Sequence, residues 1–276
     1  MSTGRISGLL NMKFEGNILK MRTELADPVK YYLPVGENEV PLNNLLGETV
    51  SLLFTGQINC ISCGKRIKTS FNQGFCYDCL QTAPEASETI IRPELSKAHL
   101  GIARDMEWAK LHDLIDHYVY LALSGEVKVG VTRNHQIPTR WIDQGASEAI
   151  IVAKTPNRHI AGVIEVWLKK YFSDKTPWRS MLQNNIAEGV NLPEEKLKAI
   201  RLLPSELQKY KHSDREVLRI NYPVLRYPDK IKNTGFDKNT VLEGRLTGIK
   251  GQYLLFEDGS VINIRKHNGY FLEVSY

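Results

Sequence analysis

The only four cysteines of the 276-residue chain form two pairs with the spacing of metal ligands. Two residues separate Cys60 from Cys63 and Cys76 from Cys79, and twelve residues lie between the pairs. Each Cys-x2-Cys turn places two thiolates on one side of a tight loop, so two such turns supply the ligands of a tetrahedral zinc site. Four thiolates leave no position for a substrate, and we therefore expect a structural Zn²⁺ that folds residues 59–82 as a zinc ribbon.

Two disulfides or four free thiols are the alternatives to a metal site. Disulfides persist in oxidising compartments, and residues 1–20 lack the apolar run of a secretory signal peptide. No stretch of the sequence approaches the apolar length of a membrane span. We therefore expect a cytoplasmic protein that makes no membrane contact and keeps its thiols reduced.

Basic and aromatic residues surround the cysteine pairs. The net charge of +5, from 36 basic and 31 acidic residues, permits a polyanionic partner without demanding one. Local clusters carry more weight, and the loop between the pairs combines cations with aromatic rings that can stack on bases. A solvated surface is the alternative reading of these residues, which are Lys65, Arg66, Lys68, Phe71, Phe75 and Tyr77.

A second cluster of the same kind lies near the C-terminus. Its residues are typical of the binding face of a small β-barrel, where aromatic side chains alternate with cations. A solvated surface is again the alternative. The residues are Arg245, Lys250, Tyr253, Arg265, Lys266 and Tyr270.

The middle of the chain shows the pattern of a small α/β unit. Residues 118–131 alternate as a hairpin with a Ser-Gly turn at Ser124 and Gly125. A short helix is expected after Pro138, and a third strand at 149–153. The strongest helix signal covers residues 160–171, where apolar residues recur at helical spacing.

The two ends of the chain read as β-structure. Strands are expected within residues 1–58 and again after residue 241, with a hairpin turn at Asp258-Gly259. Each end is short for an independent barrel, so we expect them to pair into one small barrel-like domain. The fold class is therefore α+β: a three-stranded α/β core, a zinc ribbon and a barrel-like β domain.

The expected domain organisation follows from these segments, and at this length about two folded domains are expected. The hydrophobic content of 42% and the charged content of 24% are ordinary for a soluble globular protein. The predicted segments are an N-terminal β segment at 1–58, the zinc ribbon at 59–82, a linker at 83–103, the α/β core at 104–186, a helical connector at 187–215 and a C-terminal β domain at 216–276.

The α/β core resembles the GIY-YIG nuclease superfamily, especially its divergent phage-type branch. Tyr118-Val119-Tyr120 occupies the place of the first motif, with Tyr120 as the motif tyrosine, and Lys128-Val129-Gly130 that of the second. Arg140 stands where the family has a helix arginine, and Glu165 matches its metal-binding glutamate. The resemblance covers about a fifth of the chain, and Lys128 departs from the tyrosine that many members have.

The resemblance implies a phosphodiesterase chemistry for these residues. Glu165 would hold Mg²⁺ or Mn²⁺ to stabilise charge on a phosphate, Arg140 would pair with that phosphate, and Tyr120 would position the attacking water. Each residue also has a structural explanation: Tyr120 in the core, Gly130 at a strand end, and Glu165 at the rim of a closely packed helix. Ala161 and Gly162, one turn before Glu165, leave room for either a ligand or a neighbouring backbone.

The whole chain resembles a bacterial family of unknown function. The shared marks are Cys60-Ile61-Ser62-Cys63-Gly64-Lys65, Gly74-Phe75-Cys76-Tyr77 and Arg140-Trp141-Ile142-Asp143-Gln144-Gly145-Ala146. This resemblance implies no activity.

Three functions remain open from the sequence. The first is a zinc-containing protein that binds DNA or RNA through Lys65, Arg66, Lys68, Lys128, Gly130 and Trp141. The second is a metal-dependent endonuclease that uses Tyr120, Arg140 and Glu165. The third is a non-catalytic scaffold for protein interactions, in which the metal and the core serve only the architecture.

Overall fold

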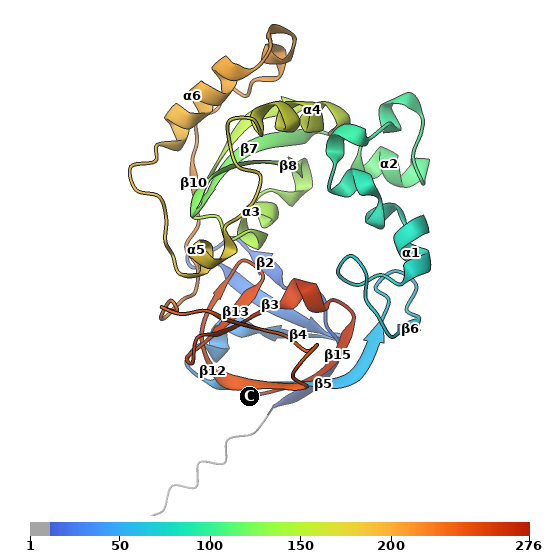
Figure 1. The fold of residues 1–276 in the computed structure, drawn as a ribbon, viewed down its shortest axis with the longest axis vertical. Coiled ribbons are helices and arrows are strands. Elements are labelled where there is room, and N and C mark those ends of the chain that lie inside the picture. Colours follow the sequence, from blue (N-terminus) through green and yellow to red (C-terminus); the bar gives the residue numbers. More distant parts are fainter. Residues whose placement is uncertain (1–11) are drawn as a thin grey trace, which may run out of the picture.

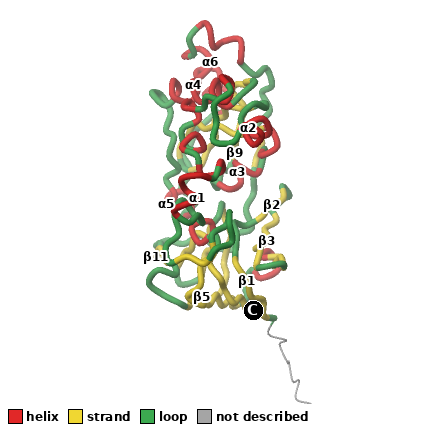
Figure 2. Tube along the Cα trace, turned by 90° about the vertical axis from the view of Figure 1, so that its right-hand side faces the viewer, coloured by secondary structure: helices red, strands yellow, loops and turns green. Residues whose placement is uncertain are grey.

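The computed structural model describes residues 12–276 and has a mixed α+β architecture with several sheets and mostly short helices. One end of the molecule holds a four-stranded sheet with the longer helices, and the other end holds a larger sheet (Figure 1). Figure 2 shows the same division, with the helices α4 and α6 at one end and strands β1 and β5 at the other. The first eleven residues of the predicted 1–58 segment lie outside the described residues.

The larger sheet joins strands from both ends of the sequence. Strands of residues 13–59 pair with strands of residues 241–275 because alternate residues of both, such as Val50, Leu52, Leu272 and Val274, are buried in one core. In order of pairing, the strands are β1 (Lys13–Asn17), β15 (Tyr270–Ser275), β5 (Thr49–Asn59), β12 (Val241–Lys250), β13 (Tyr253–Phe256), β14 (Ser260–Asn263) and β11 (Lys232–Thr234), with β6 (Arg66–Ile67) beside β5.

The sheet does not close into the expected barrel. Its order runs from β1 to β11, and within residues 12–276 no pairing joins these two edges. Lys232 and Asn233 of β11 are exposed, and Lys13 of β1 is exposed as well. Charged and polar edge residues of this kind keep an edge strand from pairing further.

A three-stranded sheet packs against the larger one. Tyr31, Leu33 and Val35 of its central strand are almost fully buried in the same core. The elements are β2 (Arg22–Glu24), β3 (Lys30–Val35), β4 (Asn38–Pro41) and the 3-10 helix η1 (Leu42–Leu45).

The four-stranded sheet contains the predicted hairpin. Its strands β7 (His117–Ser124) and β8 (Glu126–Arg133) pair antiparallel, and Gly125 makes the turn with a φ of +97°. The expected third strand is β9 (Glu148–Thr155), and a fourth, β10 (Leu218–Arg219), is added from the C-terminal segment.

Helices cover this sheet and lead into it. The main helix α4 (Arg158–Leu168) begins where Asn157 Oδ1 accepts a hydrogen bond from the amide of Ile160 at 3.0 Å. It buries Ala161, Ile164 and Leu168, leaves Val163 exposed, and ends at Leu168 rather than at the expected residue 171. The others are α2 (Met106–His112), η6 (Asn134–Gln136), α3 (Thr139–Asp143), α5 (Trp178–Leu182), α6 (Leu192–Leu202) and η7 (Ser205–Tyr210).

Residues 83–103, expected as a linker, form an arm that packs on α4. Its η4 passes so close to Gly162 that a Cβ there would lie 2.2 Å from the backbone nitrogen of Glu94. The small residue before Glu165 therefore accommodates a backbone. The arm follows α1 (Tyr77–Thr82) and consists of η2 (Pro84–Ala86), η3 (Glu88–Ile90), η4 (Pro93–Leu95) and η5 (Ala98–Leu100).

One face of the four-stranded sheet shares a hydrophobic core with the β part, and its other face packs into a core of its own. Tyr120, Trp141 and Ile142 belong to the same buried cluster as the residues of β5 and β15. Asp143 at the end of α3 ties the parts together, accepting from Lys20 Nζ at 2.7 Å and from Gln252 Nε2 at 2.8 Å. Within residues 12–276 no helix is both long and apolar enough to cross a membrane.

Candidate functional site

The four cysteines converge into a cluster that could bind a metal ion. Their sulfur atoms all lie within 4.8 Å of one another, and the Sγ atoms of Cys63 and Cys76 are 3.9 Å apart. A tetrahedron of sulfurs about 2.3 Å from zinc has edges of about 3.8 Å, so the donor set and its size fit Zn²⁺. All four thiols are free, so the arrangement contains no disulfide.

The local chain explains why the sulfurs meet. Strand β5 delivers Cys60 to a turn in which Gly64 adopts a φ of +73°, a conformation that favours glycine. Cys76 caps α1, because its sulfur accepts a hydrogen bond from the amide of Cys79 at 3.3 Å. We refer to residues 60–79 as the cysteine knuckle.

The thiols of the knuckle influence one another's ionisation. Burial alone opposes ionisation of Cys60, but hydrogen bonds from the backbone amides of Cys63 and Cys76 outweigh it and lower the pKa of Cys60 to about 6. The side chain of Cys76 raises the pKa of Cys79 to about 12. Thiolates so close together repel one another, and a bound divalent cation would relieve this repulsion.

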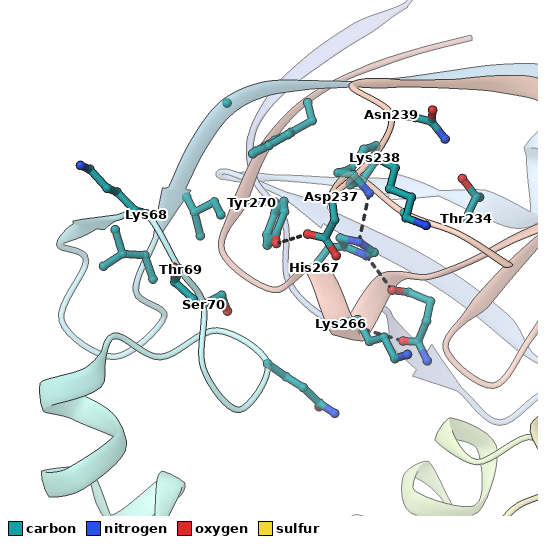
Figure 3. Close-up of a pocket in the computed structure, with 18 of the residues that line it drawn as sticks. Lys68, Thr69, Ser70, Thr234, Asp237, Lys238, Asn239, Lys266, His267 and Tyr270 are labelled. Atoms are coloured by element: carbon teal, nitrogen blue, oxygen red, sulfur yellow. Dashed lines mark hydrogen bonds between the residues drawn. The ribbon is translucent and has the colours of Figure 1, made fainter.

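A groove of about 1200 Å³ runs between the cysteine knuckle and the larger sheet. Figure 3 shows its two walls: Lys68, Thr69 and Ser70 on the knuckle side, and the chain around Lys238, Lys266 and Tyr270 on the sheet side. Lys266 belongs to the short helix η8 (Ile264–His267). Segments from residues 54–73 and 233–270 therefore form one concave surface.

The groove is predominantly basic. Its lining includes four cations, Arg66, Lys68, Lys238 and Lys266, all of them exposed, and one acidic residue, Asp237. Asp237 accepts a hydrogen bond from the hydroxyl of Tyr270 at 3.3 Å. Tyr270 packs on Phe54 with their ring centroids 4.9 Å apart, which gives the groove an aromatic floor.

The candidate residues of the α/β core form a second, mostly buried group. Tyr120 is fully buried, and its hydroxyl donates to Gln144 Oε1 at 3.2 Å. The ammonium of Lys128 donates to the same oxygen. It also donates to Thr176 Oγ1 at 2.6 Å. Burial, together with the positive charge of Arg140, lowers the pKa of Lys128 to about 7. Lys128 is therefore a core residue without a surface to offer to a polyanion.

Arg140 and Glu165 lie within electrostatic range of Tyr120. Burial raises the pKa of Tyr120, the charge of Arg140 opposes that rise, and the charge of Glu165 adds to it. The charges of Arg140 and Glu165 thus both act on Tyr120, and these are the three residues that the nuclease resemblance selects. Glu165, however, is 8% exposed and pairs with Lys169 at 3.6 Å, and burial raises the pKa of its carboxyl.

The remaining candidates divide by exposure. Lys65 is exposed on the cysteine knuckle beside the groove-lining Arg66 and Lys68. Trp141 is 4% exposed and packs edge-on against Tyr120, with ring centroids 5.8 Å apart, so it supports the core. Gly130 lies opposite Tyr120 in the hairpin and leaves room for its ring.

Two contributors to these sites were not selected as candidates from the sequence. Lys238 lies in a polar loop, and only the pairing of β5 with β12 brings that loop opposite the cysteine knuckle. Gln144, which joins Tyr120 and Lys128, stands within the family mark from Arg140 to Ala146, but that mark assigns it no role. Contacts between distant segments, rather than local spacing, bring both residues into the sites.

Comparison with known proteins identifies a family. The model of the family described as "Protein of unknown function (DUF2797)" matches residues 47–272, which include the cysteine knuckle, the four-stranded sheet and most of the larger sheet. No curated protein and no solved structure matches the chain. The chain therefore belongs to the DUF2797 family of proteins of unknown function.

Proposed function

We propose that the protein binds nucleic acid in the groove between the cysteine knuckle and the larger sheet. The observation that carries the proposal is the charge of this groove, in which four exposed cations and one carboxylate line about 1200 Å³. A phosphate backbone is the common polyanion that matches a long basic groove with an aromatic floor. None of the four cations has a carboxylate within 4 Å among residues 12–276, so all are available to phosphates.

In this proposal the metal is Zn²⁺ and its role is structural. Cys60, Cys63, Cys76 and Cys79 would hold it. The knuckle has little core of its own, since only the packing of Phe75 against two alanines supports it. The metal would therefore fix the position of Arg66 and Lys68, which form one wall of the groove.

Cleavage of the bound strand is a second candidate, because the charges of Arg140 and Glu165 both act on Tyr120. The resemblance to the GIY-YIG superfamily assigns these three residues to catalysis and a divalent cation to Glu165. The carboxylate does not fit that role as it stands, because it is buried and paired with Lys169. We derive no metal-dependent step from it, and we favour binding over cleavage.

Fluorescence anisotropy with labelled single-stranded and double-stranded DNA and RNA tests the proposal. We expect binding that Lys68→Gln with Lys266→Gln weakens and that Lys30→Gln, an exposed lysine of β3 outside the groove, leaves unchanged. Absence of binding to every nucleic acid at low salt would overturn the proposal and favour a protein-interaction scaffold. Incubation with Mg²⁺ or Mn²⁺ beside Glu165→Gln tests cleavage, and intact substrate under all conditions would exclude it.

A further inference from the structure

A second cavity, of about 420 Å³, lies in the α/β part and shares no lining residue with the groove. Its volume falls within the roughly 300–1,000 Å³ of small-molecule sites. Helix α2, strands β7 and β8, helices α3 and α4, and η8 each contribute to its wall. The arm also contributes through Ile90 and through the exposed Glu85, which is the one acidic residue of the lining.

Four arginines line this cavity: Arg133, Arg140, Arg158 and Arg265. Arg158 pairs with Asp113 at 3.5 Å, but the other three have no carboxylate within 4 Å among residues 12–276. Arg133 is partly buried, and its Nε has no hydrogen-bond partner within the same residues. Such guanidinium groups lack a counter-charge that a compact anion would supply.

The arginines also perturb one another. Burial, together with the charge of Arg158, lowers the pKa of Arg133 to about 10. Burial lowers the pKa of Arg265 as well, and the charge of Arg140 adds to this effect. Clustered like charges are unfavourable for folding by themselves, so an anion that bound here would stabilise the protein.

A buried histidine adds a different requirement. His117 is 0% exposed and lines the cavity, and its Nδ1 donates to the carbonyl of Ile115 at 2.8 Å. Burial lowers the pKa of His117 to about 4, so the ring is neutral and its Nε2 carries a lone pair. Nε2 has no partner within residues 12–276 and is suited to accept from a hydroxyl or amino group of a ligand.

An aromatic pair completes the wall. Trp108 and His112 of α2 both line the cavity and stack on each other at a centroid distance of 4.0 Å. A ring system next to cations and a hydrogen-bond acceptor provides an apolar surface for a planar group. The cavity thus offers cations, one acceptor and an aromatic wall together.

We propose that this cavity binds a nucleotide through its phosphate monoester. Arg133, Arg140 and Arg265 receive the phosphate oxygens, His117 accepts from a hydroxyl or amino group, and Trp108 lies along the base. The proposal does not require that the groove bind nucleic acid. The ligand is either a free mononucleotide or the phosphorylated end of a strand. The positions of Arg265 and Lys266 make a strand end feasible. These neighbours in η8 line the cavity and the groove, respectively.

Isothermal titration of the full-length protein with adenosine 5′-monophosphate, inorganic phosphate and adenosine tests the proposal. We expect the monophosphate to bind, phosphate to bind more weakly, and adenosine not to bind. Arg265→Gln should weaken monophosphate binding by about tenfold or more, whereas Lys30→Gln, which lies outside both the cavity and the groove, should not. Binding of no phosphate-containing probe, or equal binding by wild type and Arg265→Gln, would overturn the proposal.

A second variant guards against a folding defect. Arg133→Met removes a buried charge that has no acidic partner, so we expect the thermal midpoint to stay level or rise while monophosphate binding falls. A variant that unfolds less readily and still binds like the wild type would contradict the assignment of Arg133.

Oligonucleotides with and without a 5′-phosphate distinguish the two sources. If the phosphate strengthens binding, and Arg265→Gln but not Lys30→Gln removes the gain, the cavity receives a strand end. If the 5′-phosphate has no effect while the monophosphate binds, the ligand is a free nucleotide. Both outcomes uphold the cavity assignment. Failure of the groove proposal is separate, because it would appear as unchanged oligonucleotide binding in Lys68→Gln with Lys266→Gln.

Discussion

The hydroxyl of Tyr120 lies directly over the backbone of Gly130, its partner on the neighbouring strand. A Cβ atom at residue 130 would lie 2.6 Å from that oxygen and 2.7 Å from Cζ. Gly130→Ala must therefore displace a fully buried tyrosine, and we expect the free energy of unfolding to fall by roughly 1–3 kcal/mol. Urea denaturation followed by circular dichroism measures the change.

A double-mutant cycle shows whether the ring causes this loss. In the background of Tyr120→Leu the crowding atoms are absent, so Gly130→Ala should cost less than about 0.5 kcal/mol. If Gly130→Ala destabilised the Tyr120→Leu protein as much as the wild type, Gly130 would be needed for a reason other than the tyrosine ring.

The sequence predicted those features of the fold that depend on local spacing. Residues close together in the chain determine three of these features: the cysteine pairs, the hairpin turn at Gly125 and the helix that begins after Asn157. The open edges of the larger sheet were not predictable, because strand closure depends on which edges meet in space. The packing of residues 83–103 on α4 was not predictable either. Gly162 makes room for it, but a glycine in a helix does not by itself indicate what packs there.

The candidate site shows the same limit. Tyr120, Arg140 and Glu165 could be selected by resemblance, and the charges of Arg140 and Glu165 do act on Tyr120, but their role in chemistry stays a prediction. Their burial could not be read from the sequence, and neither could the pairing of Glu165 with Lys169, since both depend on packing between elements. Residues on both sides of the groove were anticipated, Arg66 and Lys68 in one cluster and Lys266 and Tyr270 in another, but not that the two clusters form one groove.

Gly162 is a site where a single methyl group should detach the arm of residues 83–103. In Gly162→Ala the added Cβ would lie 2.2 Å from the backbone nitrogen of Glu94, and backbone atoms cannot move aside cheaply. We expect hydrogen exchange in residues 83–103 to accelerate and the protein to lose about 2 kcal/mol or more of stability, despite the better helix propensity of alanine. The matched control is Val163→Ala, an exposed position on the same helix, which should leave exchange in the arm unchanged. Unchanged exchange in Gly162→Ala would contradict the close packing.

Lys128 should make stability depend on pH. Its pKa of about 7 in the folded protein lies below its usual value of 10.5, so between these values the unfolded chain binds more protons than the folded one. The free energy of unfolding must then rise with pH in this window, by about 2 kcal/mol from pH 7 to 9 through this residue alone. Chemical denaturation at both pH values should show that Lys128→Met removes this increment. The same pH dependence in wild type and variant would show that Lys128 does not titrate in this range.

Removal of the metal should affect the cysteine knuckle first. Elemental analysis is expected to find zinc at about one ion per chain, and Cys63→Ser should lower that content, whereas Ser62→Ala should not. Without the ion, hydrogen exchange in residues 59–82 should accelerate while the four-stranded sheet stays protected, because the sheet has its own core. Purified protein that lacks metal and still protects residues 59–82 would contradict a structural ion.

The most direct measurement of the central claim is the salt dependence of oligonucleotide binding. For a strand held in the groove by Arg66, Lys68, Lys238 and Lys266, the logarithm of the binding constant should fall linearly with the logarithm of salt concentration. Replacing Lys68 and Lys266 with glutamine should reduce the slope by about one to two, and Lys30→Gln should leave it unchanged. A slope that is the same in all three proteins, or affinity that does not respond to salt, would contradict binding in the groove.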